Sequence, residues 1–135
     1  MASTVTGNVS RPHGEYVGQA MGSYGGTLNL FDTIVWGNLQ IPATGGPDLI
    51  VGALSTVNLA YSDIGSMQSV TGGGGVLNDL GGNVSVDPQL ISYRLAGGSP
   101  LVDAGTCVGV PSIDIDGDPR PTGASCDIGA DEFVP

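Results

Sequence analysis

The chain repeats itself at a spacing of 30 residues, and this repetition limits the folds open to it more than any other feature. The stretch STVTGN at residues 3–8 aligns with TIVWGN at residues 33–38. At the same spacing, LNLFDTI at residues 28–34 aligns with NLAYSDI at residues 58–64. Two independent matches at one spacing are typical of proteins built from stacked repeats.

The repeats have the alternation of β-strands. Residues 28–36 alternate in side-chain character and are rich in β-branched and aromatic types, whereas glycine or proline interrupts nearly every stretch long enough for a helix. An antiparallel sandwich would need tight Asn-Gly or Asp-Gly hairpins, and the one Asp-Gly, at Asp116-Gly117, lies near the end of the chain. Strands that recur at a fixed spacing instead favour a parallel solenoid, in which each strand pairs with its copy in the next coil. We therefore predict an all-β solenoid.

The charge of the chain excludes two classes of partner. The formal net charge is −10, the three cations are all arginines, and lysine is absent. Nucleic acid requires a basic surface, and an anionic membrane surface would repel this chain. Calcium remains a candidate cofactor, because it binds oxygen ligands. The first ten residues lack the basic start and apolar middle of a signal peptide, so we expect the chain to begin within a fold.

Two cysteines, Cys107 and Cys126, lie in a stretch rich in glycine and aspartate. Their spacing favours a disulfide, and the alternative is a pair of free buried thiols. Because disulfides persist outside the cytoplasm, we predict an extracellular or cell-surface protein.

Several motifs resemble a known family: TIVWGN, YSDIG, GGNVSVDPQL, SPLVDAG, DIDGDPRP and CDIGADEF. In this order they resemble the closing part of bacterial right-handed parallel β-helix surface proteins of the choice-of-anchor Q domain type, within the wider pectin-lyase-like superfamily. The resemblance implies three parallel sheets wound into a triangular coil around stacked aliphatic side chains. From it we expect about four rungs over residues 1–98, namely an N-terminal rung and rungs at 27–38, 57–64 and 83–90. A disulfide-stapled acidic cap is expected over residues 99–135.

The expected cap contains candidate ligands for a metal ion. Asp114, Asp116 and Asp118 alternate along DIDGD, but an EF-hand counted from Asp114 would need glycine and glutamate where Pro119 and Ser125 stand. One interpretation is a looser calcium site that uses these three carboxylates with Asp103 or Asp127. The other is a turn at Asp116-Gly117 in a segment that closes the solenoid, with Arg120 paired to a carboxylate, Asp127 or Asp114.

Catalytic machinery is not evident in the sequence. His13 is the only histidine, no G-x-S-x-G motif surrounds a serine, and the lysine-free composition argues against the cationic base of pectate-lyase relatives. Trp36 is the aromatic residue that we predict to contact a ligand, since the 30-residue spacing places Thr6 and Ser66 at its position in the other repeats. The same spacing stacks Phe31 on Tyr61.

We therefore expect a secreted or cell-surface structural or binding module that contacts carbohydrate or another surface ligand. The alternative is a small calcium-dependent carbohydrate-active or hydrolytic enzyme, a hydrolase or polysaccharide lyase, that uses clustered aspartates. Loops are expected at 39–48 and 65–75. The first rung would present an unpaired strand edge, which predicts either an end-to-end homodimer through this rung or its protection by residues 10–26.

Overall fold

The computed structural model describes residues 2–10, 21–40, 47–69 and 74–135, and within these ranges the chain is all-β without a helix. The all-β prediction is therefore confirmed. The strands are β1 (Ser3–Thr6), β2 (Val9–Ser10), β3 (Met21–Ser23), β4 (Gly26–Phe31), β5 (Thr33–Trp36), β6 (Leu39–Gln40), β7 (Leu49–Val51), β8 (Ser55–Ala60), β9 (Asp63–Ile64), β10 (Met67–Ser69), β11 (Val76–Asp79), β12 (Leu90–Ile91) and β13 (Arg94–Leu95).

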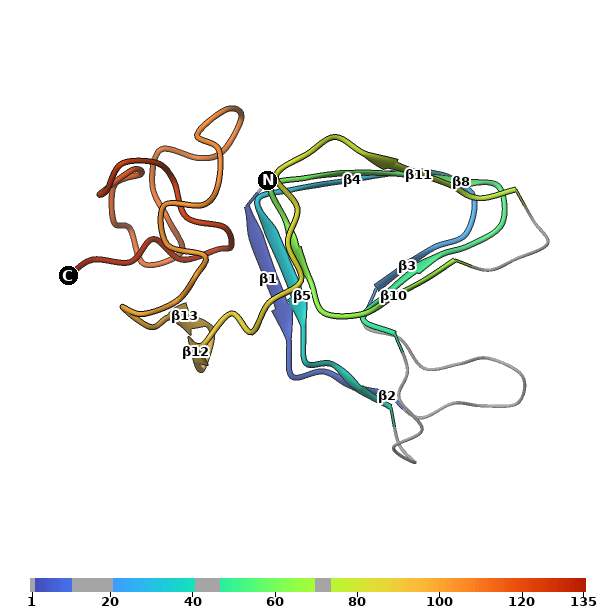
Figure 1. Ribbon diagram of the computed structural model, residues 1–135, viewed down its shortest axis with the longest axis horizontal. Coiled ribbons are helices and arrows are strands. Elements are labelled where there is room, and N and C mark those ends of the chain that lie inside the picture. The colour runs from blue at the N-terminus through green and yellow to red at the C-terminus, as the bar shows by residue number, and fades with distance from the viewer. Residues whose placement is uncertain (1, 11–20, 41–46, 70–73) are drawn as a thin grey trace.

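The first eleven strands form three parallel sheets and one parallel pair. The sheets have the orders β1-β5-β9, β3-β7-β10 and β4-β8-β11, and β2 pairs with β6. The chain passes through the three sheets in turn and then repeats the circuit, so each strand lies beside its counterpart from the previous circuit (Figure 1). The parallel pairing predicted from the repeat is confirmed.

The register agrees with one sequence match and corrects the other. Ser3 lies beside Thr33, as the 30-residue spacing predicts. In the next match Asn29 lies beside Asn58, which is a spacing of 29 residues, so Phe31 stacks on Ala60 and not on Tyr61. The third circuit is shorter still, because β9 leads to β10 through only Gly65 and Ser66, without a counterpart of β2 or β6.

The corners between sheets depend on residues in the left-handed region of backbone space. Asp32 (φ 49°), Tyr61 (φ 47°) and Gly81 (φ 99°) occupy successive positions of the corner after β4, β8 and β11. This conformation costs a non-glycine residue of the order of 1 kcal/mol, and aspartate tolerates it best among charged residues. The same left-handed backbone conformation therefore recurs at each stacked corner, although the side chain at that position differs from one corner to the next.

Aliphatic side chains fill the space enclosed by the sheets. The interior core consists of Leu30, Val35, Leu49, Val51, Val57, Leu59 and Ile64, with Val5, Met21 and Leu28 at its margin. Removal of this apolar surface from water is the main favourable term for such a stack, at roughly 25 cal/mol per Å². A second cluster lies outside the coil, where Ile34 of β5 packs with Leu95, Leu101 and Ile128.

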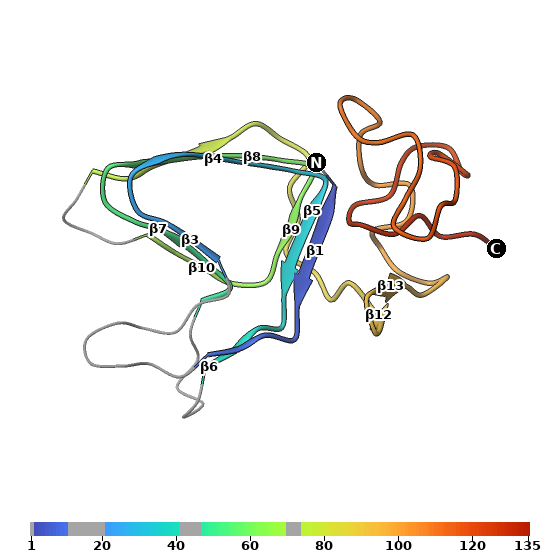
Figure 2. The ribbon, with the colours of Figure 1, turned by 180° about the vertical axis from the view of Figure 1, so that it is seen from behind.

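Residues 99–135, hereafter the terminal segment, lie beside the sheet β1-β5-β9 (Figures 1 and 2). Gly129 donates its N–H to the main-chain oxygen of Asp32 at 3.1 Å, and Thr106 donates its N–H to Oδ1 of Asp32 at 2.6 Å. Ala130 donates its N–H to Oγ1 of Thr4 at 3.0 Å. These contacts belong to the first two circuits. The segment therefore covers a flank of the coil, which corrects the expectation that it closes the last rung.

The last circuit keeps an exposed end. Of the fourth rung predicted at residues 83–90, only Val84 pairs in parallel, with Asp63, and the chain then turns into the antiparallel pair β12-β13. Val76 and Leu77 of β11 remain 48% and 40% exposed. The terminal segment packs instead against the apolar outer face around Ile34, because in this position it buries both Ile34 and the carboxylate of Asp32 at the corner. The loops expected at 39–48 and 65–75 are wrong where they contain the strands β6 and β10. Residues 41–46 and 70–73 of these loops, and residues 11–20 of the stretch predicted to protect the first rung, lie outside the described residues.

Candidate functional site: the terminal segment and the asparagine face

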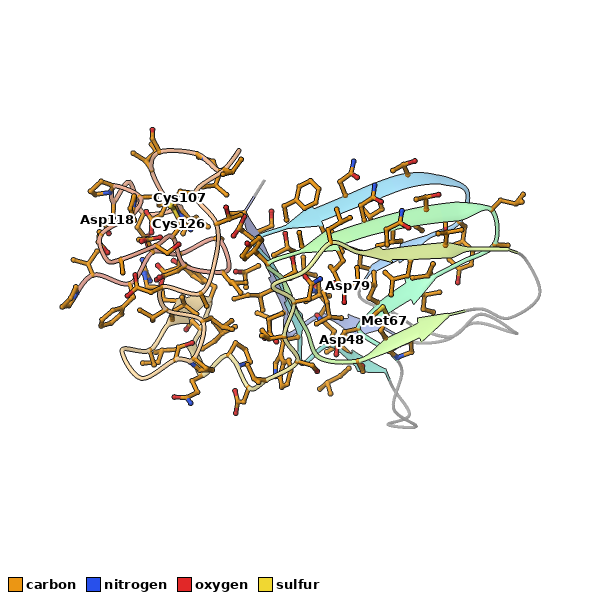
Figure 3. The ribbon with its side chains drawn as sticks, turned by 45° about the horizontal axis from the view of Figure 1, so that its top comes forward. Asp48, Met67, Asp79, Cys107, Asp118 and Cys126 are labelled. Atoms are coloured by element: carbon orange, nitrogen blue, oxygen red, sulfur yellow. A yellow bond between two sulfur atoms is a disulfide. The ribbon has the colours of Figure 1, made fainter. Side chains whose placement is uncertain are left out.

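The disulfide predicted between Cys107 and Cys126 is present, so the alternative of two free thiols is wrong. Cys126 is fully buried and Cys107 is exposed. Figure 3 shows both cysteines with Asp118 in the terminal segment, apart from Met67 and Asp79 of the coil. A disulfide is compatible with an extracellular location.

Asp114 organises the DIDGD turn through its carboxylate. Oδ1 accepts the N–H groups of Asp116 and Asp118, each at 2.8 Å, and Oδ2 accepts the N–H of Glu132 at 2.9 Å. Burial alone would raise the pKa of Asp114, but these N–H groups and that of Gly117 outweigh it and hold the pKa below its usual value. Asp114 is thus an ionised acceptor that fixes the loop.

Arg120 pairs with Glu132, which corrects the predicted partner, Asp127. Nε of Arg120 lies 3.8 Å from Oε2 of Glu132, both side chains are only 1% exposed, and Nη2 donates to the main-chain oxygen of Gly129 at 2.9 Å. Asp127 uses its two oxygens to accept the N–H groups of Asp103 and Phe133, at 2.7 Å each. Backbone donors therefore satisfy Asp127, and the guanidinium pairs with Glu132.

A group of three carboxylates from this region could hold a cation. One oxygen each from Asp114, Asp116 and Asp131 lies within 4.8 Å of the others. Two of these residues belong to the predicted set, whereas Asp118 lines the adjoining pocket, of about 220 Å³, without joining the group. Sequence spacing could not reveal Asp131, because it comes from CDIGADEF and approaches DIDGD only through the fold of the segment.

Arg94 already supplies a positive charge to this group. Its Nε and Nη2 donate to the two oxygens of Asp116 at 2.7 and 2.5 Å, and its guanidinium lies 4.8 Å from the centre of the Tyr93 ring. The hydrogen bond to Asp116 raises the pKa of Arg94. Through its two hydrogen bonds, the guanidinium gives the Asp116 carboxylate a positive partner, as a metal ion would. A cation bound at this group would therefore compete with Arg94 for Asp116.

Two buried carboxylates of the coil have one oxygen each without a hydrogen-bond partner among the described residues. Asp63 accepts the N–H of Val86 at 2.9 Å through Oδ1, and Asp32 accepts that of Thr106 through Oδ1, but Oδ2 of each is buried and unpaired. Burial raises the pKa of Asp63 to about 6, and the nearby charges of Asp48 and Asp87 add to the shift. Burial also raises the pKa of Asp32.

Asp63 gives the stability of the protein a pH dependence. The folded state holds this proton more tightly than the unfolded chain, in which the carboxyl titrates near 3.8. The free energy of unfolding is therefore expected to fall from about pH 4 and to level off above about pH 6, by up to about 3 kcal/mol. The buried carboxyls of Asp127 and Asp131, whose pKa values burial also raises, change stability in the same direction.

Urea unfolding of the parent and of Asp63→Asn across this pH range tests the dependence. The variant should show a smaller fall, since its amide does not ionise. Equal slopes for parent and Asp63→Asn would contradict the assignment to Asp63.

An asparagine ladder runs along the outer face of the sheet β4-β8-β11, and we name Asn29, Asn58 and Asn78 the asparagine face. Nδ2 of Asn58 donates to Oδ1 of Asn29 at 2.6 Å, and Nδ2 of Asn78 donates to Oδ1 of Asn58 at 2.8 Å. Each bond uses one of the two amide hydrogens, so the other remains directed to solvent. The sequence carried a signal for this ladder, since Asn29 and Asn58 occur in both copies of the repeat, but the alignment was displaced by one residue.

Trp36 is a half-buried packing residue at the end of β5. It contacts the outer cluster around Ile34, and its ring lies over Gly65, where an added Cβ would approach Cε3 to 3.0 Å. Gly65 and not Ser66 is therefore its neighbour in the third circuit, while Thr6 is its neighbour in the first, as expected. Ligand contact by Trp36 stays a prediction, and His13 lies outside the described residues.

In the described part of the chain, no helix has the length and apolar character needed to cross a membrane. Comparisons with protein-family models, with curated proteins and with solved structures find no match to this chain.

Proposed function

We propose that the chain is a secreted or cell-surface module that binds carbohydrate or another surface ligand, built on a right-handed parallel β-helix of the choice-of-anchor Q type. The observation that carries the proposal is the in-register parallel stacking of three circuits, which sets Asn29, Asn58 and Asn78 in one exposed row. The disulfide and the resemblance of the terminal motifs support a location outside the cytoplasm.

The asparagine face suits a carbohydrate because it presents a row of polar amides that hydrogen bonds hold in register. Sugar hydroxyl groups both donate and accept hydrogen bonds, and each ladder amide keeps a donor for such a group after it has bonded its neighbour. Phe31 lies two residues after Asn29 and thus on the same face of β4, so an apolar side of a sugar ring has a partner as well. Binding without turnover is the activity that this arrangement supports.

Retention on insoluble polysaccharides, measured with calcium and with chelator, tests the proposal. We expect at least one polysaccharide to retain the parent protein and Arg94→Ala, but not Asn58→Leu, whose side chain interrupts the ladder at its centre. Release of new reducing ends or unsaturated sugars would favour an enzyme instead. Retention of Asn58→Leu at parental levels would show that the asparagine face is not the binding surface.

A calcium-dependent enzyme or calcium-stabilised module is the second candidate, and the group Asp114, Asp116 and Asp131 is the observation that favours it. Calcium binds carboxylate oxygens at about 2.3–2.6 Å, so an ion at this group would have to displace Arg94 from Asp116.

The Arg94→Ala variant tests whether the group Asp114, Asp116 and Asp131 binds calcium. The substitution removes the competing guanidinium and leaves the carboxylates in place, so millimolar calcium is expected to raise the melting temperature of the variant more than that of the parent. Magnesium, which fits such sites less well, is the matched control. An absence of calcium stabilisation in both proteins would exclude this group as a calcium site.

A further inference from the structure

The DIDGD turn contains Asp116, the one aspartate in the chain that a glycine follows. Gly117 lies in the left-handed region of backbone space, at φ 94°, and has no side chain to shield its N–H from the preceding carboxyl group. A bond between the nitrogen of Gly117 and Cγ of Asp116 would close a five-membered ring. The two residues can therefore rearrange with water as the only further reactant.

The rearrangement is a dehydration followed by a hydrolysis. In the first step the nitrogen of Gly117 bonds to Cγ of Asp116, and the bond from Cγ to one carboxylate oxygen breaks. That oxygen takes up the N–H proton and one proton from solvent and leaves as water, so a succinimide forms. In the second step water adds to the main-chain carbonyl carbon of Asp116, whose bond to the nitrogen breaks. The nitrogen regains its hydrogen, the new carboxyl group returns a proton to solvent, and the product is isoaspartate, in which the main chain runs through Cγ.

Arg94 holds the carboxylate that must react. Its Nε and Nη2 donate to the two oxygens of Asp116 at 2.7 and 2.5 Å, across a sequence separation of 22 residues. The guanidinium lies 4.8 Å from the centre of the Tyr93 ring, which supports it from one side. Because one carboxylate oxygen leaves during ring closure, at least one of the two bonds to Arg94 has to break first. The pair with Arg94 therefore opposes ring closure.

The nitrogen that must attack is restrained only weakly. Gly117 donates its N–H to the main-chain oxygen of Asp114 at 3.4 Å, which is long for a hydrogen bond. The side chains of Arg94 and Asp116 are 50% and 28% exposed, so water can reach the carboxylate and leave it. An ion pair that is exposed to this extent opens readily. The structure therefore slows the rearrangement without preventing it.

We propose that Asp116-Gly117 is a modification site, at which the folded protein converts slowly to isoaspartate, and that Arg94 sets the rate by holding the carboxylate. The conversion adds a methylene group to the main chain and shifts the carboxylate of residue 116 away from Arg94. It also disturbs the N–H groups of Asp116 and Asp118, which Oδ1 of Asp114 accepts. The conversion requires neither a carbohydrate nor calcium, so it is independent of the proposed function.

Ageing of the parent and of Arg94→Ala at neutral pH, followed by proteolytic digestion and mass spectrometry, tests the site. Isoaspartate at position 116 keeps the parental mass and is distinguished by chromatography and electron-transfer fragmentation, whereas the succinimide lacks one water. We expect isoaspartate to accumulate about two- to fivefold faster in Arg94→Ala, the factor by which an exposed ion pair usually shifts an equilibrium. A synthetic peptide of residues 112–120 should convert faster than both proteins, because it has neither restraint.

Two variants separate the hold on the carboxylate from a general loosening of the pair β12-β13. Tyr93→Leu removes the ring beside the guanidinium but keeps both bonds to Asp116, so it should convert at the parental rate. In Asp116→Glu combined with Arg94→Ala, closure would need a six-membered ring, so no isomer should form at this position. Asp103, which precedes Ala104 in the same segment, is the internal reference for non-specific ageing.

Three outcomes would overturn the proposal. Equal rates for the parent and Arg94→Ala would remove the role of Arg94, and so would an equal acceleration in Tyr93→Leu. Conversion at Asp103 as fast as at Asp116 would indicate ageing of an unfolded fraction and not of this turn. Conversion of the peptide while both proteins remain unmodified at Asp116 would show that the folded turn is not a modification site.

Discussion

Replacement of Arg120 by methionine is expected to lower the free energy of unfolding by about 3 to 5 kcal/mol. The substitution fills a similar volume but leaves Glu132 in a site where both side chains are only 1% exposed. Glu132 also accepts the N–H groups of Thr122 and Asp127, so its displacement disturbs the backbone of the terminal segment. Urea unfolding near neutral pH measures the loss.

The double variant Arg120→Met with Glu132→Gln tests how much of this loss in stability comes from the unpaired charge of Glu132. It removes both ions while the amide oxygen of Gln can still accept one backbone N–H, so we expect it to be more stable than Arg120→Met alone. Arg94→Met is the control at the exposed pair with Asp116, where the loss should be much smaller than at Arg120. An unchanged melting temperature for Arg120→Met would contradict the structural role of the pair.

Loss of the disulfide is expected to cost about 3 kcal/mol through the entropy of the unfolded chain. Cys107 and Cys126 are separated by 19 positions, and residues 99–135 contain no strand, only the single bridge between Ile113 and Pro119. The order of the terminal segment therefore depends on the disulfide and on carboxylates that bind backbone N–H groups. The variant Cys107→Ser with Cys126→Ala respects the exposure of the first position and the burial of the second.

Melting of the parent with and without reductant, beside the double variant, measures this effect. The reduced parent and the variant should both melt lower than the oxidised parent, and reductant should leave the variant unchanged. If the three melt at one temperature, the disulfide does not stabilise the folded state. Near-neutral pH keeps the Asp63 contribution constant in this comparison.

The repeat predicted much of the coil because parallel stacking sets equivalent residues side by side. The pairing of Ser3 with Thr33 follows directly from STVTGN and TIVWGN. The second match failed by one residue, since Asn29 pairs with Asn58 after a circuit of 29 residues. A residue gained or lost at a corner changes the spacing without changing the pattern inside a strand, so the strands could be predicted better than their register.

The candidate site was predicted in part. The disulfide and two members of the carboxylate group, Asp114 and Asp116, were predicted from local sequence, whereas the third member, Asp131, was not. The predicted partner of Arg120, Asp127, was wrong because several carboxylates lie near Arg120 in sequence and only the packing of the segment selects Glu132.

The sequence by itself determined that the chain forms short parallel strands in stacked circuits and that its two cysteines are close enough to join. Both depend on local pattern, namely alternation, glycine at corners and spacing along the chain. The tertiary structure alone decided that the terminal segment lies on the flank of the coil. That position follows from burial of Ile34 with Leu101 and Ile128, which are distant in sequence. Tertiary burial also raises the pKa of Asp63, which local sequence could not predict.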